Sequence, residues 1–466
     1  MTGLRWRPLD ISKKLFQNVN AAILPAGFSV LENAYITETG GHQRFPVLKT
    51  FTTLSSGGIV YPYEWRGQLV CATSTGKVFI VAPDGTEREI AGTPLAGGRR
   101  VVFAETEDRL LMAAGDQIIQ FDGDELSVLS KDAPSRVTHI AYLGGFVVAN
   151  DLGTQLFFHN ETAGDYDTWR ALDVFAADRD PDTINSLIGN DFNELIIGGE
   201  HSIEQHELGI NSIFSFRFRI SGSVFAPYTL VFTNNAAWAL ASNREFIRIS
   251  GQSTKPFSED IARTLEAVDD WTDAWAHPVA VDGQDFIILQ APLATNPDGN
   301  AGLTFLMDVR NDRWSNLYVQ GTSGLRDIWP GYSYAYHDRL NRRFVGSDQG
   351  VLYEMTTTFS DAAKVQKVRG RSAPYAPGFV AIENVRMRVE RGVGAADANP
   401  IIRFRAHRDG RPSRWVQRSL GGAGVHAPYI EFGGFGSGSA FEFEWEYSEP
   451  TALNIRALEA QVTRAD

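Results

Sequence analysis

Cysteine is almost absent from this chain of 466 residues, and helical periodicity and long apolar runs are also scarce. The single cysteine, Cys71, permits no internal disulfide, and its place in the apolar segment QLVCATS predicts a buried core residue. No apolar run approaches the ~18–20 residues that span a bilayer, and the first residues lack the apolar region of a secretory signal. We therefore expect a soluble protein that is made in the cytoplasm.

The chain is acidic, but its charge is uneven. It contains 43 Lys and Arg against 56 Asp and Glu, for a formal charge of −13. Residues 361–466 hold 15 basic and 12 acidic residues, a net charge of +3, which leaves −16 for residues 1–360. This acidity argues against a protein that wraps nucleic acid with a basic surface. The shift in charge predicts a domain boundary within residues 361–378.

A two-strand phrase recurs along the first three quarters of the chain. Each copy has an apolar strand, a turn with Gly, Asn or Asp, and a second strand. Copies begin at Gly67, Asp108, Gly144, Asn193, Asn234, Asp285 and Arg342, with spacings of 41, 36, 49, 41, 51 and 57 residues. A period of ~40–50 residues with four short strands per repeat is typical of a β-propeller. We predict an all-β chain with a propeller of six to eight blades, and the alternatives are a solenoid or a pair of sandwiches.

The remaining segments complete the predicted domain plan. Residues 1–56 form an N-terminal extended segment, residues 57–360 the propeller, residues 361–378 an exposed linker, and residues 379–466 a C-terminal antiparallel β-sandwich-like domain. Within the propeller, Ile261, Leu265, Val268 and Trp271 are spaced as on a helix, which predicts one or two short helices. Large rings are expected to fill the wedges between blades, and the candidates are Trp65, Trp169, Trp238 and Trp314.

The sequence offers little catalytic chemistry. No nucleotide-binding, metalloprotease, esterase or EF-hand motif is present, and we expect no catalytic residue, no cofactor and no metal site. The nearest approach to a catalytic pair is Asp165 and Asp167, which share one face if GDYDTW is extended, as two carboxylates of a glycosidase could. A simple turn explains this pattern equally well.

Four arginines are candidates for contacts with another subunit or partner. FSFRFRISG is expected to point Phe214, Phe216 and Phe218 inward and Arg217 and Arg219 outward, onto either solvent or the acidic surface of a second chain. Arg369 and Arg371 lie in the expected linker, where neighbouring rings or fibres could bind.

The order of several phrases resembles the packaged-DNA stabilisation proteins, the tail accessory or hub proteins of short-tailed phages. The resemblance begins in ENAYITETGGHQRFPVLKTF (Glu32–Phe51), with an Asn-bearing segment, a Gly turn and an Arg/Phe-Pro element. It continues through residues 173–209, where Asp182 and Ile184 precede a strand that ends at Gly198, and Ser202, Ile203 and Glu204 open the next. A later blade with an Asp308–Trp314 turn is also similar, whereas no Gly follows Pro46 as is common in such proteins.

The resemblance implies a structural virion protein rather than an enzyme. Such proteins form a ring, expected to be a hexamer, below the portal and its head-to-tail adaptor ring in the virion tail, and they are assembled in the bacterial cytoplasm. They carry tail fibres or tailspikes, meet the tail tip or needle, and retain double-stranded DNA that passes through the lumen without sequence-specific binding. An acidic wall would let DNA slide instead of holding it.

Two other functions remain open. The first is a phage-borne glycan-binding or glycan-hydrolysing propeller that acts on host surface sugar, for which Asp165 and Asp167 are the candidate acids. The second is a scaffolding propeller of the host, which would be expressed without any virion.

Overall fold

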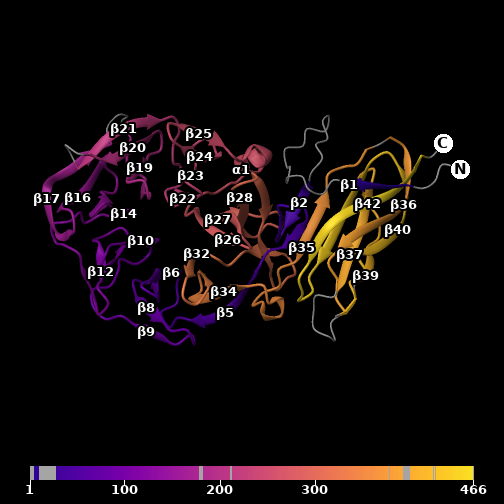
Figure 1. Ribbon diagram of the computed structural model, residues 1–466, viewed down its shortest axis with the longest axis horizontal. Coiled ribbons are helices and arrows are strands. Elements are labelled where there is room, and N and C mark those ends of the chain that lie inside the picture. Colours follow the sequence, from indigo (N-terminus) through magenta and orange to yellow (C-terminus); the bar gives the residue numbers. More distant parts are fainter. Residues whose placement is uncertain are drawn as a thin grey trace.

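The computed structural model describes residues 5–9, 28–177, 182–209, 213–376, 378–391, 399–422, 424–425 and 427–464. In Figure 1 a ring of β-sheets around a central axis occupies one end of the long axis, and two stacked sheets occupy the other. The fold is an all-β propeller with a C-terminal sandwich, as predicted. No helix in the described ranges is long and apolar enough to cross a membrane.

Seven four-stranded antiparallel blades make up the propeller within the described residues. Six are separate sheets, and β26–β29 belong to a ten-stranded sheet. In each blade the strands follow one another from the axis outward (Figure 1). The first blade contains β6 (Val60–Trp65), β7 (Gln68–Thr73), β8 (Val78–Val81) and β9 (Glu87–Glu89), and the second contains β10 (Val102–Glu105), β11 (Leu110–Ala113), β12 (Ile119–Phe121) and β13 (Leu126–Val128). The third contains β14 (Ile140–Leu143), β15 (Phe146–Asn150), β16 (Leu156–Thr162) and β17 (Asp165–Ala176), and the fourth contains β18 (Ser186–Gly189), β19 (Glu194–Gly198), β20 (Ile203–Leu208) and β21 (Phe214–Ile220).

The last three blades follow the same pattern, and the seventh takes its outer strand from the start of the chain. They are β22 (Val231–Thr233), β23 (Ala236–Leu240), β24 (Phe246–Ser250) and β25 (Ser253–Pro256); β26 (Trp275–Val281), β27 (Gln284–Thr295), β28 (Ala301–Asp308) and β29 (Arg313–Asn316); and β32 (Ser333–His337), β33 (Arg342–Gly346), β34 (Val351–Thr356) and β5 (Val47–Thr53). The pairing of β5 with β34 closes the ring. Each of the seven phrases in the sequence contains the second and third strands of one blade.

Short elements connect the blades. The segment with predicted helical spacing forms η1 (Glu259–Ile261) and α1 (Ala262–Glu266), and its four apolar side chains are buried. A hairpin of β30 (Tyr318–Gln320) and β31 (Arg326–Ile328) leads into the seventh blade, and η2 (Phe359–Asp361) follows it. Cys71 is fully buried on β7, where burial raises the pKa of its thiol, and the four tryptophans that were expected between blades are also buried.

Both ends of the chain build the sandwich. One sheet contains β1 (Arg5–Leu9), β3 (Ala34–Ile36), β4 (His42–Arg44), β36 (Val380–Val389), β40 (Tyr429–Gly438) and β42 (Asn454–Arg464). The other contains β2 (Phe28–Glu32), β35 (Val368–Ser372), β37 (Ile401–Arg408), β38 (Arg411–Pro412), β39 (Val416–Ser419) and β41 (Phe441–Tyr447). Aromatic rings fill the space between the sheets, with Phe404 and Phe432 stacked at 4.4 Å between centroids.

The domain plan from the sequence differs from the structure at two places. Residues 1–56 were predicted as a separate extended segment, but their described strands belong to the sandwich and to the seventh blade. Residues 361–378 were predicted as an exposed linker, yet β35 lies there, hydrogen-bonded between β2 and β41. These segments give no clear sheet signal by themselves, because β1, β2, β5 and β35 pair with strands more than 60 residues away in the sequence, whereas the β3–β4 hairpin is local.

A ladder of charges covers one face of the sandwich. On β41, Glu442, Glu444 and Glu446 alternate with Phe441, Phe443 and Trp445, so one face is acidic and the other fills the core. The Glu444 carboxylate is fully buried and lies 2.7 Å from Arg369, 2.6 Å from Arg405 and 2.7 Å from His407. Burial alone would raise the pKa of Glu444, but these hydrogen bonds outweigh it and hold the pKa at about 2.

The ladder predicts that Glu444→Gln lowers the free energy of unfolding by about 3–5 kcal/mol at pH 7, because the facing arginines lose a buried counter-charge. Since the folded-state pKa is depressed, this contribution is present above pH ~4.5 and disappears as the pH falls toward 2. Urea denaturation at pH 7 measures the change. Asp361→Asn, which breaks an exposed pair with Lys49 at 3.0 Å, is the control and should change little. Equal losses of unfolding free energy in Glu444→Gln and Asp361→Asn would contradict a stabilising role of the ladder.

Candidate functional site

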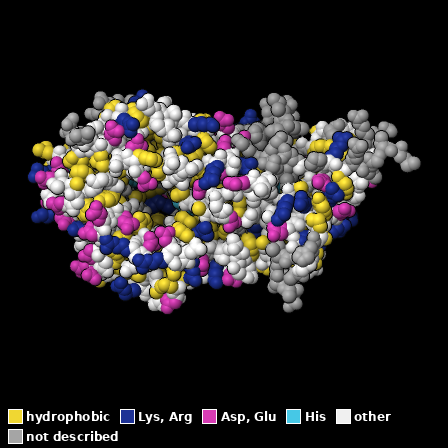
Figure 2. Space-filling model, in the orientation of Figure 1, with side chains coloured by type: hydrophobic (Ala, Val, Ile, Leu, Met, Phe, Trp, Pro, Cys, Tyr) yellow, Lys and Arg dark blue, Asp and Glu magenta, His cyan; other side chains and the backbone are white. Residues whose placement is uncertain are grey.

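The largest described cavity lies where the inner strands of the propeller converge. Its volume is about 620 Å³, and small-molecule sites typically enclose ~300–1,000 Å³. In Figure 2 the propeller face is hollowed near its centre, and Lys and Arg side chains are visible inside the hollow. We call this the channel cavity, and it is lined by Ile59, Tyr61, Ser74, Gly98, Arg99, Arg100, Tyr228, Asp273, Pro292, Leu293, Tyr332 and Asp348.

Arg100 is the central cation of the channel cavity. It lies in the crossover between the first two blades, and its guanidinium donates to the backbone carbonyl of Tyr332. The guanidinium carbon is 4.5 Å from the ring centre of Trp275, 5.4 Å from that of Tyr61 and 5.9 Å from that of Tyr228. Burial lowers the pKa of Arg100, while nearby tyrosines and Asp273 act against this shift. Aromatic faces therefore stabilise the charge in place of an ion pair.

Behind this cation, two histidines extend the aromatic walls. The His277 ring stacks between Trp275 and Tyr334, with centroid separations of 4.7 and 5.5 Å. Neither of its ring nitrogens has a hydrogen-bond partner among the described residues. His139 stacks on Tyr228 at 5.1 Å. Burial lowers the pKa of His139 to about 4 and that of His277 well below its usual value, so both rings are neutral at pH 7.

Two carboxylates, those of Asp273 and Asp348, line the same cavity as Arg100. Asp273 is exposed, and its backbone has a φ of 59°, in the left-handed region that Asp and Asn tolerate best among residues with a side chain. Asp348 acts on the hydroxyl of Tyr332, whose pKa is raised by burial and by this carboxylate. The cavity thus combines a guanidinium, tyrosine rings and two acceptors, an arrangement that can bind a ligand with one negative charge and several hydroxyls.

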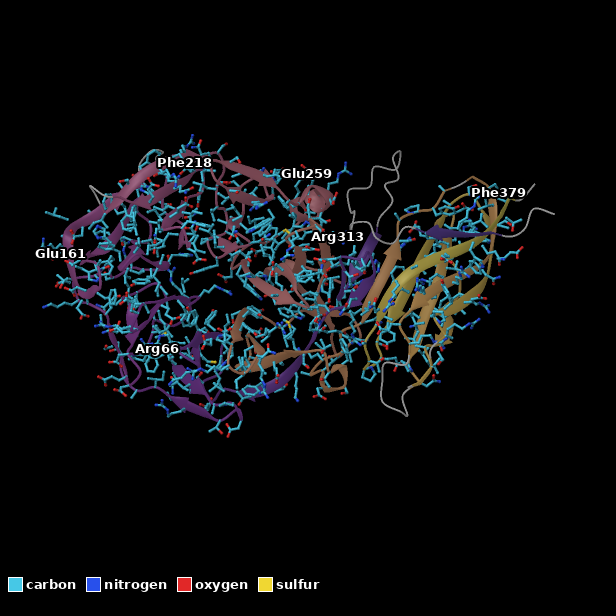
Figure 3. The ribbon with its side chains drawn as sticks, viewed as in Figure 1. Arg66, Glu161, Phe218, Glu259, Arg313 and Phe379 are labelled. Atoms are coloured by element: carbon cyan, nitrogen blue, oxygen red, sulfur yellow. The ribbon has the colours of Figure 1, made fainter. Side chains whose placement is uncertain are left out.

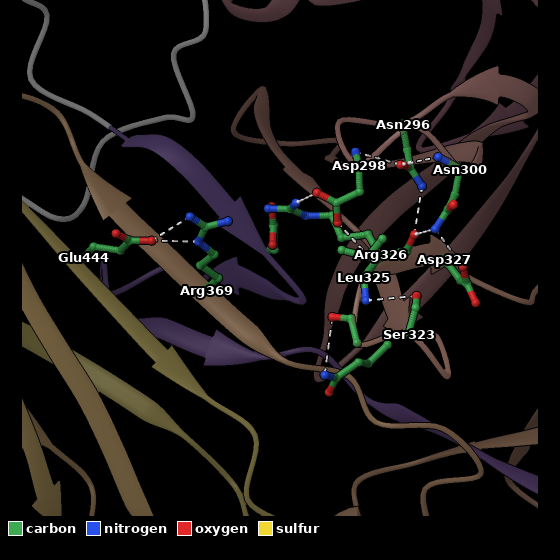
Figure 4. Close-up of polar contacts among 12 residues, drawn as sticks. Asn296, Asp298, Asn300, Ser323, Leu325, Arg326, Asp327, Arg369 and Glu444 are labelled. Carbon is green, nitrogen blue, oxygen red and sulfur yellow. Dashed lines mark hydrogen bonds and ion pairs between the residues drawn. The ribbon is translucent and has the colours of Figure 1, made fainter. Parts of the chain in front are cut away.

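A second cavity, of about 110 Å³, lies between the propeller and the sandwich. Figure 4 shows its centre, where Arg326 on β31 donates to Asp298 at 2.7 Å. The same guanidinium donates to Glu32 on β2 at 2.9 Å. Burial raises the pKa of Glu32, although Arg326 acts against this shift. Because these groups are already paired with one another, we assign this cluster to fastening the two modules.

The arginines predicted for partner contacts already have partners in the chain. Arg217 is 44% exposed and lies 2.8 Å from Glu194 and 3.0 Å from Glu207, while Arg219 is exposed. Arg369 lies 2.7 Å from Glu444, and Arg371 lies 2.5 Å from Glu442. Their contact with a second molecule stays a prediction. On the same strand as Arg217, Phe214 is buried as expected but Phe216 is 38% exposed, because a bulge at Arg217, in this strand, shifts the register.

The carboxylates proposed as glycosidase acids stabilise local structure at the rim. Asp165 accepts hydrogen bonds from the backbone N–H of Asp167 and the hydroxyl of Thr168, and the latter bond is the main reason why its pKa is lowered. Asp167 pairs with Arg109 at 2.7 Å. A general acid needs a raised pKa, so the environment of Asp165 is the opposite of the one required.

Two parts of residues 173–209, the stretch that resembles the phage family, lie next to each other in the structure. The Asp182 carboxylate accepts hydrogen bonds from the backbone N–H of His201 at 2.7 Å, and from the N–H and hydroxyl of Ser202 at 3.0 and 3.1 Å. On β20, which follows Ser202, Glu204 is buried and lies 3.0 Å from His206. These residues therefore fold the fourth blade and do not face the channel cavity. No group of three or more metal-binding side chains occurs in the part of the chain that the structure describes.

Sequence reasoning missed the channel cavity. Its cation lies in GGRR (Gly97–Arg100), a basic pair after two glycines in the gap between two phrases. The gap between the phrases could have indicated the cavity, because the crossover from one blade to the next ends at the propeller axis. The aromatic partners come from β6, β26 and the segments before β22 and β32, so their convergence is a property of the closed ring.

No family model matches this sequence, and no curated protein matches it either. Solved structures do resemble the fold. One is the extracellular domain of a hybrid two-component system from B. thetaiotaomicron, with a TM-score of 0.44 and 12% identity, covering 77% of this chain and 45% of that chain. Another is a streptogramin B lyase, with a TM-score of 0.46 and 10% identity, covering 66% of this chain and 97% of that chain. This chain thus matches less than half of the first structure's length.

The buried histidines predict a loss of stability in mild acid. In unfolded chains they take up protons below pH ~6.5, whereas in the folded state they stay neutral to about pH 4 or lower, so the free energy of unfolding falls as the pH decreases from 7 to 5. His277→Phe keeps the ring stack and removes one titrating group, which should reduce this loss by about 2 kcal/mol. Urea denaturation at both pH values tests this, with exposed His201→Gln as the control. An unchanged loss in His277→Phe would refute it.

Proposed function

We propose that this protein is a structural component of a short-tailed phage virion, the subunit of a ring-shaped tail hub or nozzle below the portal and adaptor. In this role it retains packaged DNA, guides its ejection and anchors tail fibres or spikes. The sequence resemblance described above suggests the family, and the architecture supports a role in assembly. The observation that carries the proposal is the coupling of propeller and sandwich into one body with different surfaces at its two ends.

The coupling is extensive. β2 pairs with β29 of the sixth blade and with β35 of the sandwich, so one ten-stranded sheet crosses both modules. One hydrophobic cluster also runs from Trp238 and Trp314 in the propeller to Phe443 and Trp445 in the sandwich. Such a body can transmit force between neighbours without a hinge between its modules, as a tail wall requires.

A closed ring needs two different, complementary surfaces on each subunit. Figure 3 places Glu161, at the rim of the third blade, and Phe379, in the sandwich, at opposite ends of the molecule. The rim strand β17 is 12 residues long, pairs only with β16 in the described chain, and exposes 88% of Leu172. An unpaired outer strand with an exposed apolar side chain favours contact with another chain. We assign the ring contact to β17 of one subunit and the sandwich of the next.

Charge supports this head-to-tail contact. Residues 47–360, which contain the propeller, hold 23 Lys and Arg against 41 Asp and Glu, a net charge of −18, whereas residues 1–46 and 361–466, which supply the sandwich strands, hold 20 against 15, a net charge of +5. Propeller against propeller would repel, whereas propeller against sandwich brings unlike charges together. The overall acidity also suits a lumen through which DNA slides without binding.

The first test is quantitative mass spectrometry of purified virions. A hexameric ring against a portal of about twelve subunits predicts roughly one copy per two portal subunits. Absence from the virion would overturn the proposal.

A second test addresses the ring contact. Leu172→Glu should reduce ring formation by the recombinant protein at least about tenfold, because it places a charge in an apolar contact. Light scattering coupled to size-exclusion chromatography measures the oligomer. Val365→Glu is a matched control, since Val365 is also an exposed apolar residue, at 46%, but lies outside β17. Equal loss in both variants would argue against β17, and a wild-type protein that stays monomeric at all concentrations would argue against self-assembly.

The channel cavity favours a second candidate function, a glycan-binding propeller. Its volume, tyrosine walls and hydroxyl acceptors suit a sugar ligand. A hydrolytic version that uses Asp165 and Asp167 would need a second site on the outer strand β17, away from this cavity, where the lowered pKa of Asp165 disfavours a general acid. Turnover of a capsular or lipopolysaccharide substrate that is abolished by Asp165→Asn or Asp167→Asn would be required to support it.

A further inference from the structure

The channel cavity contains a positive charge, on Arg100, that has no ion pair among the described residues. Within the described residues, no carboxylate lies within 4.0 Å of the Arg100 guanidinium, although the ladder arginines all have such partners. In the part of the chain that the structure describes, the carbonyl of Tyr332 is the one hydrogen-bond acceptor of Arg100. A guanidinium presents five N–H donors in a planar fork that matches a carboxylate in a bidentate fashion. The free donors therefore favour an anion from outside the chain.

The walls of the cavity restrict what else this anion can carry. Tyr61, Tyr228 and Tyr332 line the cavity with phenol side chains, and Pro292 and Leu293 add apolar surface. Leu293 is 51% exposed although it lines the cavity, so apolar surface remains uncovered there. Ring faces pack against the C–H faces of a sugar, and phenol hydroxyls bond its oxygens. A volume of about 620 Å³ is also far more than one bound carboxylate needs.

The two acidic residues favour hydroxyl donors and disfavour polyanions. Asp273 and Asp348 both line the cavity that contains Arg99 and Arg100. A nucleic acid strand, with one phosphate per nucleotide, would bring further negative charges against these carboxylates. A ligand with a single carboxylate and several hydroxyls instead places its charge on Arg100 and donates hydrogen bonds to Asp273 and Asp348.

We propose that the channel cavity binds a carboxylated sugar, such as a uronic acid residue, with its carboxylate on Arg100, its ring between the tyrosines and its hydroxyls on Asp273 and Asp348. This binding site is independent of the virion role, because it needs only the closed propeller. Binding of an acidic sugar would be compatible with a hub and with a phage-borne glycan-binding propeller.

The experiment measures binding of glucuronic acid to the full chain by titration calorimetry and saturation-transfer NMR. The probes for comparison are glucose, the methyl ester of glucuronic acid, and acetate. We expect glucuronic acid to bind at least tenfold more tightly than each of them, because only it carries both the charge and the hydroxylated ring. Equal binding of glucose or of the methyl ester would refute the role of Arg100, and equal binding of acetate would refute the sugar.

Arg100→Met tests the same contact from the protein side. Met keeps an apolar side chain against Trp275 and removes the charge, so we expect at least a tenfold loss of affinity for glucuronic acid and no change for glucose. Arg88→Met is the control, because Arg88 is exposed on β9 at the propeller rim. Retained affinity in Arg100→Met would overturn the proposal. If this variant does not fold, the methyl ester comparison on the native chain still decides the matter.

Discussion

The whole structure depends on the path of residues 28–53, which run first through the sandwich and then into the propeller. This segment first forms β2 between the sixth blade and β35, then the β3–β4 hairpin in the opposite sheet of the sandwich, and finally β5, which closes the propeller. Asn33, with a φ of 54°, redirects the chain between β2 and β3. Its side chain donates to the carbonyl of Lys367 and accepts from the N–H of Tyr318. Neither module is complete without the segment.

The Arg/Phe-Pro element of the family resemblance forms the turn between β4 and β5. Arg44, at the end of β4, is buried and donates to the backbone carbonyls of Thr451 and Gln366 at 2.9 Å. Burial lowers its pKa to about 10, and its guanidinium carbon lies 4.5 Å from the ring centre of Phe359. Phe45 is fully buried and Pro46 precedes β5. The element thus passes the chain from sandwich to propeller, and both turns can form only when the modules meet.

The arginines of the charge ladder and Arg100 have different roles, and their surroundings decide between them. On the sandwich, arginines face the glutamates of β41, and each charge is matched by hydrogen bonds. In the channel cavity, aromatic rings surround Arg100 and no carboxylate of the described chain reaches it. A paired arginine stabilises the fold, whereas an arginine held by rings keeps donors free for a ligand.

The sequence by itself determined the strand repeats, their alternation and the burial of the tryptophans between blades, because these depend on period and on local turns. It also located the short helix and the Asp308–Trp314 turn, where the Asp308 carboxylate accepts from the N–H of Arg310 and Asn311. Only the tertiary structure decided the blade count, the placement of the N-terminal strands and of β35, and the channel cavity. Each of these depends on contacts between residues far apart in the chain, and such contacts form only when the ring closes.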